Sequence, residues 1–228
     1  PAEFAQALSL LRSQAAPMPL QQLRRVLGRE YGTGWEDRFA EFDYEPVAAA
    51  SIGQVHRART VDGRDLALKI QYPGVARSIA SDVDNVAVLL RMFNLLPIDL
   101  DVAGIADEAK RQLMQEADYV SEARFLEHFG TLVADEPKLL VPRVHRDLTT
   151  TRIMAMDFVE ATPLEALATA PQTQRNAVGA LLERLLFREL FEFRVMQTDP
   201  NLANYLYQQE SGRLVLLDFG ATRHFGAG

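Results

Sequence analysis

The sequence predicts an α+β fold of two lobes, in which a small N-terminal sheet lobe with extra helices precedes a mostly helical C-terminal lobe. Three observations lead to this prediction. Apolar and polar residues alternate over residues 54–71, as they do in strands. Apolar residues then recur at helical spacing over about residues 75–129. Strand patterns return near residues 151–158 and 205–217.

Each element follows from a local pattern. An Asp62-Gly63 turn joins two alternating runs, and a Ser211-Gly212 turn separates the last two. The expected helices cover residues 4–11, 20–27, 75–95, 101–129 and 176–192. The expected strands cover residues 54–60, 64–71, 141–145, 151–158, 205–207 and 214–217. These elements divide into a helical extension over 1–40, an N-terminal lobe over 41–158 and a partial C-terminal lobe over 159–228.

Composition narrows the function classes. Of 228 residues 48% are apolar, so the chain can bury a sizeable core. With 31 acidic and 24 basic residues the formal charge is -7, and no basic cluster occurs, which argues against nucleic acid as a partner. The chain has no cysteine, so disulfides and thiolate metal sites are excluded. We expect no targeting or transmembrane segment in these residues, because no apolar run is long enough to span a bilayer.

A run of small residues precedes the first alternating segment. The residues Ala48, Ala49, Ala50, Ser51, Gly53 and Val55 fit the frame of a kinase phosphate loop, GxGxxGxV, with alanine in the first two glycine positions. Small side chains let backbone N–H groups approach phosphate oxygens. The competing interpretation is that an alanine run before a strand serves packing alone.

Lys69 favours the phosphate interpretation. It lies on the second strand of the hairpin, in the sequence LALK at residues 66–69, which has the form of the kinase VAIK segment. A lysine on this strand can pair with the α and β phosphates of ATP, and Ala67 leaves room for adenine. The alternative is an ordinary solvated lysine on a strand.

Three residues near the end of the chain have the spacing of a phosphoryl-transfer site. Asp218 begins an Asp-Phe-Gly triplet after an apolar run, and Asp199 and Asn204 precede it in kinase-like order. Phosphoryl transfer needs a carboxylate that orients the nucleophile and oxygen ligands for magnesium. We therefore predict that Asp199 is catalytic and that Asn204 and Asp218 bind Mg²⁺.

A hinge segment and a carboxylate partner for Lys69 complete the predicted nucleotide site. Met156, Asp157 and Val159 follow a strand and match a kinase hinge, whose backbone groups would bond the adenine edge. A carboxylate must also hold Lys69. Glu116 and Glu122 are both candidates, and since they are six residues apart on an expected helix they would face different ways.

These motifs together resemble the UbiB/COQ8 family of atypical kinases. The segments that carry the resemblance are PVAAASIGQVH at 46–56, LKIQYPGV at 68–75, QTDPN at 197–201 and LDFGATR at 217–223. The resemblance implies a protein-kinase-like fold with a truncated C-terminal lobe. It also implies the following roles: phosphate contact for Lys69, its salt-bridge partner for Glu122, the catalytic-loop aspartate for Asp199, magnesium ligands for Asn204 and Asp218, and the family's ExD motif for residues 116–118.

The sequence departs from the family pattern in three ways. The family's KxGQ motif is absent from these residues, only ten residues follow Asp218, and Gln197-Thr198 replaces the usual His-Arg before the catalytic aspartate. Without that arginine, switching through a phosphorylated activation loop is not expected. A fragment of this kind is able to bind nucleotide without turning it over.

The resemblance implies a magnesium-dependent ATPase or atypical small-molecule kinase that supports ubiquinone biosynthesis, with ATP and Mg²⁺ as cofactors. Quinone precursors, anionic membrane lipid and other ubiquinone-pathway proteins are the further partners implied. The implied location is the bacterial cytoplasm or the mitochondrial matrix side, free or associated with a membrane. Two alternatives stay open. One is a nucleotide-gated scaffold or lipid-binding module with little turnover, and the other is a conventional protein kinase, against which the alanine loop and the missing His-Arg argue.

Overall fold

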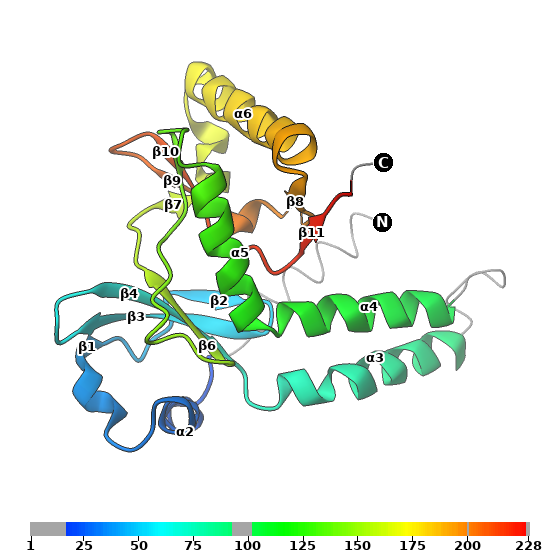
Figure 1. The fold of residues 1–228 in the computed structure, drawn as a ribbon. Helices are drawn as coiled ribbons and strands as arrows, with labels where there is room; N and C mark the ends of the chain where they lie inside the picture. Colours follow the sequence, from blue (N-terminus) through cyan, green and yellow to red (C-terminus); the bar gives the residue numbers. More distant parts are fainter. Residues whose placement is uncertain (1–16, 93–101, 200, 227–228) are drawn as a thin grey trace.

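The chain has a mixed arrangement of strands and helices, in which four strands (β1 to β4) are followed by three helices (α3 to α5) and then by further strands and one more long helix (Figure 1). The computed structural model describes residues 17–92, 102–199 and 201–226. The helix expected over residues 4–11 lies outside these residues. The helix expected over 20–27 is present as α2 (Leu20–Tyr31), and a 3₁₀ turn, η1 (Trp35–Arg38), follows it.

The main sheet is antiparallel, with strand order β1-β3-β4-β6, and the short β2 pairs with the beginning of β3. The Asp62-Gly63 turn lies between β3 and β4 as predicted, and Gly63 has a φ of 90°, which favours glycine. The strands of this sheet are β1 (Phe39–Phe42), β2 (Ala48–Ala50), β3 (Gly53–Thr60), β4 (Asp65–Gln71) and β6 (Ile153–Asp157).

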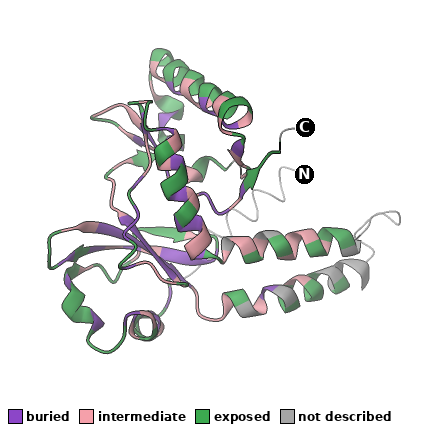
Figure 2. Ribbon diagram, in the orientation of Figure 1, coloured by how far each residue is buried: buried purple, intermediate pink, exposed green. Residues whose placement is uncertain are grey.

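Alternation along β4 divides the core into two clusters. One face carries Leu66, Leu68 and Ile70, which pack with α2 and η1. The opposite face carries Ala67, which packs with residues of helix α5 (Tyr119–Leu132). Figure 2 shows the buried central strands and the more exposed helices around them. The face that carries Ala67 also carries Lys69, so it is the one on which the site is built.

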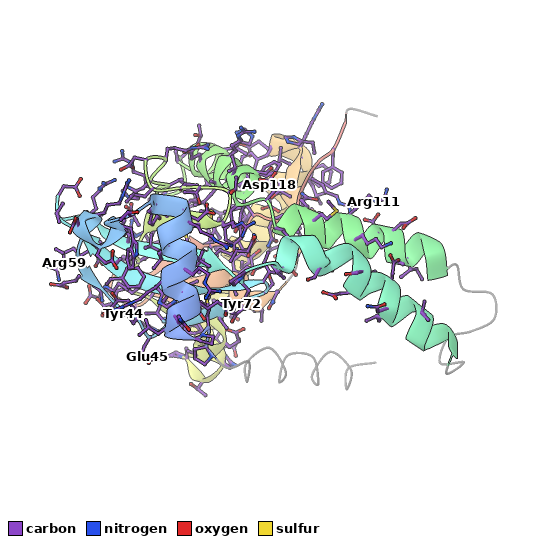
Figure 3. The ribbon with its side chains drawn as sticks, turned by 90° about the horizontal axis from the view of Figure 1, so that it is seen from below. Tyr44, Glu45, Arg59, Tyr72, Arg111 and Asp118 are labelled. Carbon is purple, nitrogen blue, oxygen red and sulfur yellow. The ribbon has the colours of Figure 1, made fainter. Side chains whose placement is uncertain are left out.

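Helices α3 (Val75–Met92) and α4 (Val102–Glu116) form a hairpin that projects from the sheet (Figure 1). The prediction of one helix over residues 101–129 was wrong, because α4 ends at Glu116 and α5 begins at Tyr119. The reason lies in Asp118, whose carboxylate accepts a hydrogen bond from the Ser121 N–H at 3.0 Å and so caps a new helix. Asp118 is labelled where the two helices meet (Figure 3).

The strand expected over residues 141–145 was also placed wrongly. Strand β5 covers only Leu139–Leu140 and pairs in parallel with β10, while Val144 forms a single bridge to Met156. Pro142 explains the interruption, since proline has no N–H to donate to a ladder.

The described residues after β6 form one long helix and most of two small sheets, the larger of which also includes β5 from before β6. The helix expected over 176–192 begins earlier, at Gln172, and it changes to a π-helical turn at Arg188. The four-stranded sheet has the order β5-β10-β9-β7, and β8 pairs with β11. The elements are β7 (Thr162–Pro163), η2 (Leu164–Thr169), α6 (Gln172–Phe187), η3 (Arg188–Phe193), β8 (Val195–Gln197), η4 (Leu202–Asn204), β9 (Tyr205–Gln208), β10 (Arg213–Leu216) and β11 (Thr222–His224). Among the helices described, none combines the length and the apolar character that crossing a membrane requires.

Candidate functional site

Lys69 connects three separate segments of the chain. It extends from β4, and its Nζ lies 2.6 Å from Glu122 Oε1 on α5 and 3.1 Å from Asp218 Oδ2 after β10. The Lys69 side chain is only 8% exposed and that of Glu122 is 1% exposed. The buried Lys69 ammonium therefore joins β4 to Asp218, which lies 149 positions later in the sequence.

The electrostatics of this cluster favour its charged form. Burial opposes the charge of Lys69, but attraction to Glu122 and Asp218 outweighs burial and raises the pKa of the ammonium. Burial likewise disfavours the Asp218 carboxylate. The Lys69 charge and a hydrogen bond from the Gly220 N–H nevertheless bring the pKa of Asp218 below its ordinary value. Both shifts favour a charged Lys69 beside an ionised Asp218, with the Glu122 carboxyl in contact with the same ammonium.

The choice between Glu116 and Glu122 depends on the break between the helices. Glu116 is the last residue of α4, whereas Glu122 lies in the first turn of α5. The structure pairs Lys69 with Glu122. The same helix contacts the residue after Asp218, because the Phe219 ring stacks on Phe129 with centroids 4.3 Å apart. Helix α5 thus touches both the lysine and the Asp-Phe-Gly segment.

The alanine run forms a strand and a tight turn. Ala48 lies opposite Val55 and Ala50 lies opposite Gly53, with Ser51 exposed in the turn between the strands. Ala48 and Ala49 are exposed and Ala50 is partly exposed. This hairpin end leaves small side chains beside open space, as a phosphate loop requires.

Close packing of two strands explains why residue 53 is a glycine. A Cβ added there would lie 2.2 Å from the Ile70 carbonyl oxygen, so no other residue fits between β3 and β4 without separating them. The glycine is explained by close strand packing, whether or not a ligand binds nearby.

The residues expected around adenine share the face of the sheet that carries Lys69. Val55 lies opposite Lys69 in the β3–β4 pair, and Ala67 lies opposite Met156 in the β4–β6 pair. Because side chains two positions apart on a strand point the same way, these four side chains lie on one face.

The hinge segment uses part of its hydrogen-bonding capacity internally. The Asp157 N–H donates to Arg143 O at 2.9 Å, and the Phe158 N–H donates to Asp65 O at 2.9 Å. Among the described residues no hydrogen bond engages the Val159 N–H. One donor at Val159 and the carbonyl of Asp157 match the acceptor and amino group on the edge of adenine.

A histidine that the sequence did not single out holds this hinge. His145 Nε2 is 2.7 Å from Asp157 Oδ1, and its Nδ1 is 3.2 Å from Arg64 Nη1. Since arginine can only donate, Nδ1 accepts and the proton is on Nε2, which donates to Asp157. The contact joins residues from separate loops and strands, so no local pattern could have revealed it.

Asp199 and Asn204 lie together after β8. Asn204 Nδ2 donates to Asp199 Oδ2 at 3.0 Å, and the Leu217 N–H donates to Asn204 O at 3.0 Å. The second bond fixes Asn204 beside the chain that leads into Asp218. Because the amide NH₂ faces the Asp199 carboxylate, the Asn204 Oδ1 points away from it and is able to accept a cation.

Gln197 and Thr198 have a role that the sequence reading missed. Gln197 Nε2 donates to Asp218 O at 3.3 Å, and the Thr198 N–H donates to Ala221 O at 2.8 Å. These two residues connect the loop of Asp199 to the segment of Asp218. From the sequence alone, only the missing arginine was apparent at these positions. The pairing of β8 with β11 has too few residues to produce a strand pattern.

A metal ion at this place would need oxygen atoms from a bound molecule in addition to those of the protein. No group of three His, Cys, Asp or Glu side chains that could hold a metal exists within the described residues. Asn204 and Asp218 supply two oxygen ligands at most. Mg²⁺ commonly takes one or two protein oxygens and completes its six positions with water and phosphate oxygens. The donor set therefore fits magnesium that arrives with a phosphate ligand.

Glu189 is a buried carboxyl behind these residues. It lies in the π-helical turn and lines a small cavity with Gln197, Asn204 and Asp218. Burial raises the pKa of Glu189 from 4.5 to about 8, although a hydrogen bond from the Gln197 backbone N–H opposes the increase. The group is therefore protonated in the folded protein at neutral pH.

We expect Glu189 to make the folded protein less stable as pH rises. Between pH 4.5 and about 8 the folded state keeps the proton that the unfolded state has lost, so the free energy of unfolding falls as pH increases. Glu189→Gln should remove this slope and be more stable than wild type by a few kcal/mol at pH 8. Urea unfolding across this range measures it, with the exposed Glu183→Gln as control. An unchanged slope in Glu189→Gln would contradict the assignment.

Comparison with known proteins supplies the family. The model of the ABC1 atypical kinase-like domain matches residues 10–227. Mitochondrial atypical kinase COQ8B of Rattus norvegicus is 46% identical over 95% of this chain and 41% of its own length. Mitochondrial atypical kinase COQ8 of Saccharomyces cerevisiae is 41% identical over 99% of this chain and 45% of its own length. The chain thus spans less than half of these two relatives, and the resemblance to the UbiB/COQ8 family is confirmed.

Solved structures confirm the protein-kinase-like fold. The complex of Rv3197 with erythromycin from Mycobacterium tuberculosis aligns with a TM-score of 0.77 and 32% identity, over 98% of this chain and 57% of that one. The Rio2 kinase of Chaetomium thermophilum, in its ADP/Mg²⁺-phosphoaspartate complex, aligns with a TM-score of 0.51 and 14% identity, over 90% of this chain and 53% of that one. At this identity the second likeness concerns the fold alone.

Proposed function

Because this chain belongs to the ABC1 atypical kinase-like family, we propose that it binds ATP with Mg²⁺ at the Lys69 cluster and contributes to an ATPase or atypical kinase that supports ubiquinone biosynthesis. The observation that carries the proposal is the buried contact of Lys69 with Glu122 and Asp218. A cation and a metal-binding carboxylate held this close are suited to neutralising phosphate charge.

Each residue has a distinct part in this proposal. Lys69 contacts phosphate while Glu122 keeps its ammonium in place, and Asp199 orients the group that attacks. Asn204 and Asp218 are the residues that would hold magnesium. A bound nucleotide would supply the phosphoryl group, and magnesium held by these residues would offset the charge on the phosphate oxygens. The surface that receives the base is formed by Val55, Ala67, Met156, Asp157 and Val159, and the surface that receives the phosphates by Ala48, Ala49, Ala50, Ser51 and Gly53.

The proposed cellular location is taken from the relatives. The names of the two curated relatives describe them as mitochondrial atypical kinases, so we place this protein in the mitochondrial matrix or its bacterial equivalent, acting near the membrane on quinone precursors. We also propose that the boundary between the N-terminal and the C-terminal lobe lies at about residue 158. Hydrolysis of ATP measured with and without quinone-like phenols and anionic lipid vesicles tests it. Stimulated turnover supports the enzyme, whereas binding without turnover supports a nucleotide-gated scaffold.

The alanine hairpin offers a test of where the phosphates lie. Ala50 lies opposite Gly53 at the turn, so its methyl group limits the backbone angles at this position, and glycine would permit closer approach. Ala50→Gly should therefore change the affinity for ATP or ADP by a measurable factor, on the order of threefold or more. Calorimetric titration of both nucleotides measures the change.

The matched control is Ala58→Gly on the same sheet. Ala58 is buried on β3 at the opposite face, where the loss of a methyl group should lower stability by about 1 kcal/mol and leave nucleotide affinity unaltered. If Ala50→Gly has no effect on either affinity while Ala58→Gly shifts them, the phosphate site lies elsewhere.

A further inference from the structure

Gln71 lies two residues after Lys69 on β4 and on the same face of the strand. Its side chain is buried, with the residue only 3% exposed, and its amide Nε2 donates to Ala117 O at 2.9 Å. A buried amide is seldom found on a sheet face unless its hydrogen bonds are satisfied, because burial without partners costs free energy. Gln71 therefore makes a specific contact with one backbone carbonyl.

That carbonyl belongs to the joint between α4 and α5. The Ala117 N–H still bonds Leu113 O in the last turn of α4, and the Asp118 side chain then caps α5. Carbonyls at the end of a helix have no partner within the helix and need one from outside it. The Gln71 amide supplies that partner at the point where the chain changes direction.

Two side chains of β4 thus fasten the start of α5. Lys69 bonds Glu122 at 2.6 Å, and Gln71 bonds Ala117, five residues earlier, at 2.9 Å. The Glu122 N–H donates to Asp118 O at 2.9 Å. The first turn of α5 therefore connects Glu122 to Asp118, the residue next to Ala117. The two contacts tie both ends of this short segment to β4, in addition to the packing of α5 in the core.

Helix α4 also receives contacts from the segment after Asp218. Gln115 Nε2, near the joint, donates to Thr222 O at 3.2 Å, and Arg223 forms an ion pair with Glu108 in the middle of α4 at 2.7 Å. The end of α4 therefore contacts both β4 and β11. Displacement of the joint would move Glu122 relative to both Lys69 and the Asp218 segment.

We infer that Gln71 is a positioning residue that sets Glu122 against Lys69 by holding Ala117 at the α4–α5 joint. The inference rests on the proposed nucleotide function of Lys69. It differs from a purely structural role, in which the Gln71 amide would satisfy a buried carbonyl and affect stability alone. A positioning role makes the effect of Gln71 on the site depend on Glu122.

The experiment compares Gln71→Met, Glu122→Gln and the double variant, all in the complete chain. Gln71→Met should weaken Mg-ATP affinity about tenfold in calorimetric titration, and the change should nearly disappear in the Glu122→Gln background. Gln54→Met is the matched control, since Gln54 is a buried glutamine of the same sheet that bonds Met18 and His56 instead. It should lower stability without changing affinity. Full additivity in the double variant, or unchanged affinity in Gln71→Met, would overturn the inference.

A second readout does not depend on nucleotide. The rate at which an acylating reagent labels the Lys69 amine, followed by mass spectrometry with Lys138 as internal reference, should rise in Gln71→Met and Glu122→Gln but not in Gln54→Met. If wild type fails to bind Mg-ATP, the proposed function fails, and the labelling rates still decide the role of Gln71. Faster labelling in Glu122→Gln with an unchanged rate in Gln71→Met would refute that role.

Discussion

Lys69→Met should lower the free energy of unfolding by about 3–5 kcal/mol and abolish measurable Mg-ATP binding. The substitution leaves Glu122, whose side chain is 1% exposed, and Asp218 without their shared cation. Removal of one partner from a buried ion pair leaves an uncompensated charge, and costs of this size are typical. Urea unfolding and calorimetric titration measure the two effects.

Two further variants separate charge burial from ligand binding. The double variant Lys69→Met/Glu122→Gln removes both buried charges, so it should regain most of the stability while binding stays lost. Lys69→Arg keeps the positive charge, but a planar guanidinium puts its donors elsewhere. Turnover of ATP should therefore fall strongly, while the free energy of unfolding should fall less than it does in Lys69→Met. Wild-type stability in Lys69→Met, or wild-type nucleotide affinity in the double variant, would contradict the central role of this lysine.

Local patterns were sufficient for much of the fold. The β3–β4 hairpin, its Asp62-Gly63 turn and the direction of Lys69 follow from strict alternation and turn chemistry, and the structure confirms them. Strands β9 and β10 and the Gly212 turn between them, where φ is 65°, were likewise predicted. These features depend on residues that are neighbours in the sequence, which is why the sequence alone could specify them.

The features that were missed depend on contacts between distant residues. A continuous helical pattern concealed the break at Ala117 and Asp118, so Glu116 and Glu122 could not be distinguished. An aspartate such as Asp118 can be recognised from the sequence as a possible helix cap. The contact of Gln71 with Ala117, 46 residues away in the sequence, forms only in the assembled fold. Likewise, the bond from Gln197 to Asp218 bridges 21 residues and has no periodic signal.

Asp218→Asn is expected to have the largest effect on metal dependence. Asp218 is held by Lys69 and by the Gly220 N–H, and a carboxylate retains further lone pairs that can bind Mg²⁺. An amide carries no charge and offers only one oxygen, so magnesium should lose most of its ability to strengthen ATP binding. Asp135→Asn is the matched control, because Asp135 is an exposed carboxylate paired with Arg188 away from the site.

Titration of ATP in the presence and absence of Mg²⁺, against wild type, Asp218→Asn and Asp135→Asn, tests the central claim most directly. We predict that Mg²⁺ raises ATP affinity at least tenfold in wild type and in Asp135→Asn. We predict little change in Asp218→Asn, and no stabilisation of wild type by Mg²⁺ alone, because too few protein ligands surround the metal position. An equal Mg²⁺ effect in wild type and Asp218→Asn would show that the nucleotide and its metal do not bind at the Lys69 cluster.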